Sequence, residues 1–220
     1  MAIDISNITV QFGEKIVFLN FSLHVSLGEF VCIIGKTACG KSVLLKTILG
    51  EIQSQCGSIK INNHTACPSK TVGMVWQDFK LLPWMTLREN IALGATASEQ
   101  ISHYASVLQI EEFLDLLPKQ VSGGTQQRTS IARVLATGAD IILMDEPTSS
   151  IDAITATSVR HDLKTISNNR TVVYVTHDVN EAILLSTRII CLGENGTVLA
   201  DLPNNNITGN MLLEVLCETR

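Results

Sequence analysis

Residues 30–42 read FVCIIGKTACGKS, and this stretch decides the fold. Residues 30–34 are apolar without alternation, which is typical of a strand buried on both faces of a parallel sheet. Residues 35–42 fit the pattern G-x-x-x-x-G-K-[ST], and residues 42–49 continue with a helical pattern. The stretch therefore predicts a strand, a phosphate-binding loop and a helix in direct succession.

The residues of this loop are suited to bind the phosphates of a nucleoside triphosphate. Its backbone N–H groups and the positive end of the helix would face the phosphate chain, Lys41 would place a charge on the β and γ phosphates, and Ser42 would offer a hydroxyl to Mg²⁺. We expect ATP and Mg²⁺ as cofactors. The predicted ligand-binding positions of the loop are Gly35, Lys36, Thr37, Ala38, Cys39, Gly40, Lys41 and Ser42.

Short β-branched runs alternate with helix-length segments along the rest of the chain. Further strands are predicted at 3–10, 141–144, 171–176 and 188–192. Residues 1–30 and 57–61 have the character of antiparallel hairpins, and residues 86–136 carry helix signals with almost no strand signal. A final amphipathic helix is expected after the polar run 204–206. These patterns predict an α/β core with an antiparallel β part and a helical insertion.

Composition excludes several classes of protein. The chain has 220 residues and 23.9 kDa, 45% hydrophobic residues, 17% charged residues and a mean hydropathy of +0.26. With 16 Lys and Arg against 21 Asp and Glu the net charge is -5, and no basic run occurs, so nucleic-acid binding is not expected. No apolar run reaches the roughly 18 residues of a membrane span, and the N-terminus has no secretory pattern. The six cysteines are scattered without zinc-site spacing and are expected to be reduced, mostly buried thiols.

A second group of residues with a nucleotide-related pattern follows the predicted strand 141–144. Asp145 and Glu146 come directly after four apolar residues, where the strand would emerge beside the loop. Asp145 would hold Mg²⁺, and Glu146 would accept a proton from an attacking water. With Lys41 the pair predicts a nucleotide-hydrolysing site.

A third feature is the sequence Ser122-Gly123-Gly124 at the start of a helical stretch that runs on to residue 136. A serine and two glycines at a helix start form another anion-binding turn, which one site would not need. With this motif the sequence resembles the ATP-binding subunits of ABC transporters. The resemblance implies that Ser122, Gly123 and Gly124 complete the ATP site of a second copy in a head-to-tail dimer.

The resemblance covers nearly the whole chain and implies roles for four more residues. Gln77 matches the glutamine that contacts Mg²⁺ and the attacking water, and His177 matches the histidine that contacts the γ-phosphate. Asp152 matches a residue of the dimer seam. Phe12 occupies the place of the aromatic residue that stacks on adenine.

The resemblance also implies the architecture. The chain is expected to be a single ABC-type ATPase domain over 1–220, a P-loop NTPase with a mostly parallel core sheet and an antiparallel β-subdomain. The catalytic core would comprise 1–77 and 137–220, and a helical subdomain would cover about 78–136.

Residues 81–86 and 89–94 are similar to the subgroup that energises nitrate, sulfonate and taurine import. The apolar segment 81–86 could form a groove for a permease helix, or Leu81, Leu82 and Trp84 could be core of the helical subdomain. The expected partners are permease subunits, a second copy of the chain and, indirectly, an extracytoplasmic solute-binding protein. The expected location is the cytoplasm, on the inner face of the cell membrane through the permease.

Two positions depart from the family pattern. Ala38 stands where a third glycine is usual, and Thr125 replaces the usual Gln, Met or Glu. If position 38 needs a positive φ, the Cβ of alanine costs about 1 kcal/mol and could weaken the ATPase. Two other classes of function stay open at this point: a soluble P-loop kinase, and an ABC-type ATPase of DNA repair or translation, for which the sequence shows no coiled-coil insertion or basic surface.

Overall fold

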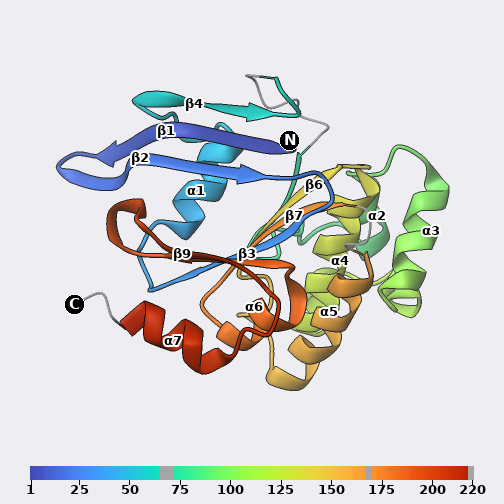
Figure 1. The fold of residues 1–220 in the computed structure, drawn as a ribbon. Helices are drawn as coiled ribbons and strands as arrows, with labels where there is room; N and C mark the ends of the chain where they lie inside the picture. The colour runs from blue at the N-terminus through green and yellow to red at the C-terminus, as the bar shows by residue number, and fades with distance from the viewer. Residues whose placement is uncertain (65–71, 167–169, 218–220) are drawn as a thin grey trace. The chain divides into compact units, whose positions relative to one another are not determined.

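The computed structural model describes residues 1–64, 72–166 and 170–217, which form two compact units (Figure 1). Unit 1 comprises Met1–Ser69 and Asn169–Arg220, and unit 2 comprises Lys70–Asn168. The boundaries expected for the helical subdomain remain a prediction.

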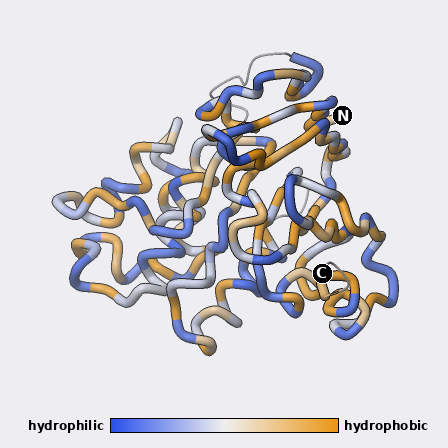
Figure 2. Tube along the Cα trace, turned by 90° about the vertical axis from the view of Figure 1, so that its left-hand side faces the viewer, coloured by the Kyte–Doolittle hydropathy of each residue, from blue (hydrophilic) through white to orange (hydrophobic). Residues whose placement is uncertain are grey.

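Unit 1 contains a small antiparallel sheet in the order β2-β1-β4. Its strands are β1 (Ile3–Phe12), β2 (Lys15–Val25) and β4 (Cys56–Ile61). Burial alternates along β1, and Figure 2 shows alternating hydrophobic and hydrophilic stretches near the N-terminus. This alternation is typical of a sheet with one face on the core. The antiparallel pairing of β1 with β2 and β4 confirms the predicted antiparallel part.

Unit 1 also holds four core strands in the order β7-β3-β8-β9. They are β3 (Phe30–Gly35), β7 (Thr171–Thr176), β8 (Arg188–Leu192) and β9 (Val198–Pro203). β3 pairs in parallel with β7 and β8 and is buried throughout, as its unbroken apolar run predicted. β9 pairs antiparallel to β8, and the sequence analysis did not find this strand. The helices of this unit are α1 (Lys41–Ile48), α6 (Val179–Leu185) and α7 (Gly209–Cys217), with the short 3-10 helix η3 (Glu194–Gly196).

Unit 2 contains two parallel strands, β5 (Val72–Val75) and β6 (Ile141–Asp145). Between them in the sequence lie only helices in the described residues, as predicted for 86–136. These are α2 (Leu87–Ala92), α3 (Ser98–Val107), α4 (Gly123–Ala136) and the 3-10 helices η1 (Glu111–Phe113) and η2 (Pro118–Gln120); α5 (Ala153–Ile166) follows β6. β5 was missed because four residues give little periodicity.

Three of the five described cysteines are buried, in line with the prediction of mostly buried thiols. Cys32, Cys39 and Cys191 are buried, Cys56 and Cys217 are exposed, and these five are free. Cys67 lies outside the described residues. In the part of the chain that the structure describes, every helix is too short or too polar to cross a bilayer.

Arg188 ties the two sheets of unit 1 together. Its Nε and Nη2 each donate to Asp201 of β9 at 2.6 Å, and its Nη1 donates to Glu29 at 3.2 Å and to the carbonyl of His24 in β2 at 2.9 Å. The hydrogen bonds to Asp201, more than those to Glu29, raise the pKa of Arg188. The guanidinium therefore satisfies acceptors from three segments at once.

We expect Arg188→Ala to lower the free energy of unfolding by about 2 kcal/mol, because it removes several charge-assisted hydrogen bonds. The thermal midpoint should fall by about 4–8 °C. The matched control is Arg88→Ala, which breaks the exposed ion pair with Asp115 and should leave the midpoint almost unchanged. Equal midpoints for the two variants would contradict this role of Arg188.

Candidate functional site

The phosphate loop, residues 35–42, leaves the carboxyl end of β3 and enters α1. Gly40 is the N-cap of α1 with φ 106, and α1 has no side-chain cap. A Cβ at Gly40 would lie 2.6 Å from Val17 of β2, so both space and φ require glycine. The loop therefore presents helix amides to a ligand, as anion-binding loops do.

Lys41 closes the loop on itself. Its side chain is 6% exposed, and Nζ donates to the carbonyls of Gly35 at 2.8 Å and of Lys36 at 3.0 Å. The ammonium is thus held over the loop, at the place where the negative charge of a phosphate chain would be neutralised.

Ala38 has φ 67, the left-handed conformation that favours glycine. Position 38 therefore has the positive φ for which the sequence predicts a penalty, and the Cβ of Ala38 costs about 1 kcal/mol in this conformation. Next to it, burial raises the pKa of the Cys39 thiol, an effect that the charge of Lys41 partly offsets. Cys39 therefore enters the loop as a neutral thiol.

The sheet register places His177 beside the start of the phosphate loop. Ile34 and Thr176 are partners in the parallel pairing of β3 and β7, and His177 is the next residue, with an exposed side chain. Carboxyl ends of parallel strands share one edge, which is where α/β proteins bind ligands. The structure of unit 1 therefore brings His177 and the loop to one edge.

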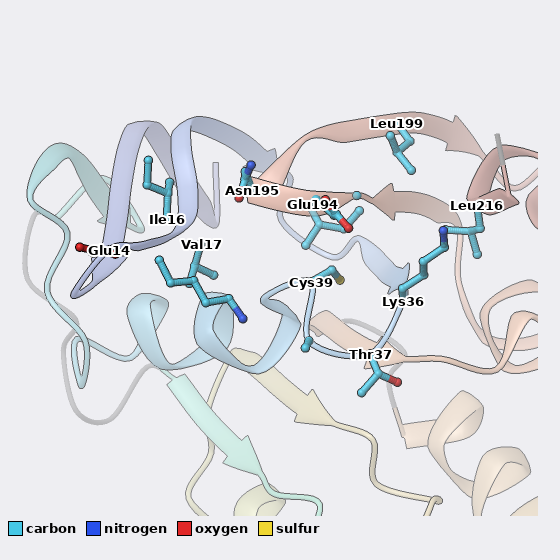
Figure 3. A pocket seen from close by; sticks show the side chains of 14 residues that line it. Glu14, Ile16, Val17, Lys36, Thr37, Cys39, Glu194, Asn195, Leu199 and Leu216 are labelled. Atoms are coloured by element: carbon cyan, nitrogen blue, oxygen red, sulfur yellow. The ribbon is translucent and has the colours of Figure 1, made fainter. Parts of the chain in front are cut away.

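A cavity of about 630 Å³ adjoins the loop on the side of β8 (Figure 3). Figure 3 shows its side chains around the space between the β1–β2 turn, the phosphate loop and the turn after β8. The sequence analysis identified only the loop residues among them. The other lining residues are Glu14, Lys15, Ile16, Val17, Leu192, Gly193, Glu194, Asn195, Leu199 and Leu216. The pairing of Gly35 with Leu192 explains why the turn after β8 lies there, and only the strand order could have predicted it.

Phe12 ends β1 and is 50% exposed. It is not among the residues that line this cavity, although residues 14–17 of the same hairpin are. The structure thus places Phe12 at the hairpin tip with its ring accessible.

In unit 2, the register of β5 and β6 brings Gln77 and Glu146 to a shared serine. Val75 pairs with Met144, and Gln77 and Glu146 each lie two positions after these paired residues. Gln77 Nε2 donates to Ser149 Oγ at 3.2 Å, and Ser149 Oγ donates to the Glu146 carbonyl at 2.9 Å. Asp145 is buried at the end of β6, and Glu146 has φ 43. The backbone thus turns sharply at Glu146, directly after the buried Asp145.

Ser122 is the N-cap of α4, and its Oγ accepts from the Thr125 N–H at 3.2 Å. The Thr125 hydroxyl lies 2.9 Å from the same oxygen, so the residue that departs from the family pattern is hydrogen-bonded to the serine. A Cβ at Gly124 would lie 2.0 Å from Thr155, which requires glycine there. Gly123 has no such close contact.

Asp152 accepts the N–H groups of Ile154 and Thr155 at the start of α5. The Thr155 side chain and N–H hold the pKa of Asp152 below its usual value. In the described residues Asp152 therefore acts as a helix cap, a role that the sequence analysis did not assign.

Known proteins are similar to this chain in sequence and fold. Residues 18–149 match the family described as ABC transporter. The aliphatic sulfonates import ATP-binding protein SsuB of Bacillus anthracis is 33% identical over 206 residues, which are 90% of this chain and 82% of that protein. The Fe(3+) ions import ATP-binding protein FbpC of Fusobacterium nucleatum is 35% identical over 201 residues, 85% of this chain and 54% of that protein.

A solved dimeric ATP-binding cassette, in a post-hydrolysis state bound to ADP and Pi, superposes with a TM-score of 0.80 at 32% identity. The superposition covers 93% of this chain and 100% of the chain of the solved cassette. The resemblance found in the sequence and the predicted α/β fold are thereby confirmed. The chain belongs to the ABC transporter family, as one of its ATP-hydrolysing subunits.

Proposed function

We propose that this chain energises an ABC importer by binding and hydrolysing ATP on the cytoplasmic face of the membrane. The observation that carries the proposal is the phosphate loop of unit 1, with Lys41 folded over it and His177 on the same edge of the sheet. The similarity to two import ATP-binding proteins over 85–90% of the chain supports the direction of transport.

In this proposal residues 35–42 bind the phosphates of ATP, and Phe12 stacks on adenine. The backbone amides at the start of α1 and the Lys41 ammonium face the negative charge. Lys41 is held within reach by two carbonyls, so it needs to move little to meet a phosphate. The loop is largely preorganised for this ligand.

Mg²⁺ fits the predicted donors, because the Ser42 hydroxyl, the Asp145 carboxylate and the Gln77 amide oxygen are hard oxygen ligands. When bound with ATP, Mg²⁺ neutralises charge on the β and γ phosphates. Asp145 is buried at the end of its strand, which fixes the direction of its carboxylate.

Glu146 is the proposed general base, and Gln77 and His177 would orient the attacking water and the γ-phosphate. The Ser149 hydroxyl connects the Glu146 backbone to the Gln77 side chain within unit 2. A movement of the Gln77 side chain would therefore alter the hydrogen bond of Ser149 to the backbone of Glu146.

A second copy of the chain would complete each ATP site through Ser122, Gly123 and Gly124, with Asp152 at the seam. Ser122 starts a helix of 14 residues, so the positive end of α4 lies at this turn. ATP would hold the two copies together, and hydrolysis would release them. The dimer would thus be a two-state device biased by ligand.

The permease is proposed to dock on the segment around Trp84. Trp84 is 71% exposed, so for this residue the interpretation as subdomain core was wrong, whereas Leu81 and Leu82 are half-buried. The buried Asn90 side chain accepts from the Leu82 N–H at 2.7 Å and donates to the carbonyls of Leu82, Met85 and Thr86. A rigid turn thus presents a large aromatic side chain, the residue type favoured at interface centres.

The solute is proposed to be a small organosulfur anion, delivered by an extracytoplasmic solute-binding protein. The segment 81–94 and the sulfonate-import relative support this choice over the ferric iron named for the other relative. We propose the domain organisation with it: a catalytic core of residues 1–77 and 137–220 and a helical subdomain of about 78–136. Transport of labelled sulfonate by the chain and its co-purified permease in vesicles tests the solute directly.

We expect Glu146→Gln to bind ATP but hydrolyse it at least about 100-fold more slowly, because the amide cannot accept the proton. With ATP it should elute from gel filtration as a dimer. Lys41→Ala is the control and should bind ATP poorly and remain a monomer. If Glu146→Gln stays monomeric at saturating ATP, the dimer proposal is wrong.

We expect Ala38→Gly to raise the thermal midpoint by about 1–2 °C, since relief of the left-handed strain outweighs the added freedom of the unfolded chain by about 0.5 kcal/mol. ATP affinity should stay the same or rise. The same substitution in helix α6, Ala182→Gly, should lower the midpoint. A decrease for both variants would show that φ at position 38 is not strained.

We expect Trp84→Ala to lower the binding of the chain to its purified permease in vesicles by about tenfold or more. Leu27→Ala, which removes an exposed apolar side chain of unit 1, is the control and should bind normally. Sedimentation with the vesicles measures both. Normal binding of Trp84→Ala would remove Trp84 from the interface.

A further inference from the structure

A buried carboxylate lies directly behind the turn that carries His177. Glu181 of α6 is 3% exposed, and its Oε2 accepts the hydroxyl of Thr176 at 2.5 Å and the hydroxyl of Tyr174 at 3.1 Å. Both donors are buried residues of β7. The carboxylate thus joins the start of α6 to the end of the strand that precedes His177.

The Thr176 hydroxyl extends this connection to the other side of His177. It donates to Glu181 and accepts the N–H of Asp178 at 3.0 Å. The Asp178 carboxylate in turn caps α6 by accepting the Asn180 N–H at 2.8 Å. The residues before and after His177 are therefore both fixed by one hydroxyl, while the imidazole itself stays exposed.

If Glu181 served only to fill space, its burial would be an unfavourable choice in free energy. A carboxylate at this depth loses its hydration, and an apolar side chain of similar size would fill the space at lower cost. The charge also acts on β3: burial raises the pKa of the Cys32 thiol, and the negative charge of Glu181 raises it further. What the carboxylate supplies is two directional hydrogen bonds from hydroxyl donors, of which the bond from Thr176 is the short one.

We propose that Glu181, acting through the Thr176 hydroxyl, is a positioning residue for His177. It fixes the turn 176–178 so that the imidazole is presented at the carboxyl end of β7, beside the phosphate loop. This inference rests on the proposed role of His177 at the γ-phosphate. It gives a buried residue of α6 a part in ATP hydrolysis without contact to the nucleotide.

The test is a double-mutant cycle with Thr176→Val and His177→Ala. Valine matches the shape of threonine but can neither donate to Glu181 nor accept from Asp178. We expect Thr176→Val to lower kcat about tenfold and to leave the KM for ATP within about twofold, because only the orientation of His177 changes. Thr176→Ser should restore kcat. In the His177→Ala background, Thr176→Val should cause no further loss.

The matched control is Tyr174→Phe, which removes the other hydroxyl from the same carboxylate but leaves the Asp178 bond intact. It should lower the thermal midpoint and keep kcat. Glu181→Gln is the second variant if Thr176→Val does not fold, and should show a smaller loss of kcat that is likewise absent in the His177→Ala background.

An NMR readout separates this inference from the proposed function. The imidazole Hε1 signal of His177, assigned by its loss in His177→Ala, should shift in Thr176→Val but not in Tyr174→Phe. Equal losses of kcat in both backgrounds, or an unchanged imidazole signal, would overturn the inference while ATP hydrolysis by the wild-type chain persists. If the wild-type chain hydrolyses no ATP, the proposed function fails, and the NMR comparison alone decides the positioning role.

Discussion

The parallel pairing of β3 with β7 and β8 is the constraint on which the site of unit 1 depends. It brings the carboxyl ends of three strands to one edge, and each end carries a different part of the site: the phosphate loop, His177 and the turn that lines the cavity. A shift of one residue in either register would exchange the side chains between the two packed faces of that strand and move these parts away from one another. The unbroken burial of β3 and β7 makes such a shift costly.

The sequence predicts those parts of the site that have a local backbone requirement. Gly40 and Lys41 are recognisable because a left-handed N-cap and a helix-start lysine leave few alternatives, and the positive φ of Ala38 follows from the same requirement. By contrast, Val17, Leu192 and Leu199 line the cavity only because distant segments meet there. Apolar residues of this kind carry no local signal, so sequence reasoning could not separate them from ordinary core.

The departures at Ala38 and Thr125 have different physical meanings. At Ala38 the backbone has the left-handed conformation that favours glycine, and a Cβ in this conformation costs free energy. At Thr125 the substituted side chain enters a new hydrogen bond with Ser122, inside a cap that would exist without it. The first departure therefore acts on the backbone of the phosphate loop, whereas the second acts on the hydrogen bonding of the Ser122 hydroxyl. In the proposed dimer, that hydroxyl would have to divide its hydrogen bonds between Thr125 and a phosphate.

One arrangement recurs at three proposed functional positions: a side chain forms hydrogen bonds to the main chain of the turn that carries the functional residue. Asn90 fixes the turn under Trp84, Ser149 fixes the backbone of Glu146, and Thr176 fixes both neighbours of His177. In each case the supporting group bonds main-chain atoms, which removes backbone freedom from the turn that carries the proposed functional side chain. Ordering such a turn only when the ligand binds would subtract from the binding free energy. Because the cost is met during folding, the binding of ATP or of a permease can be used to move whole elements, which is what a subunit that drives transport has to do.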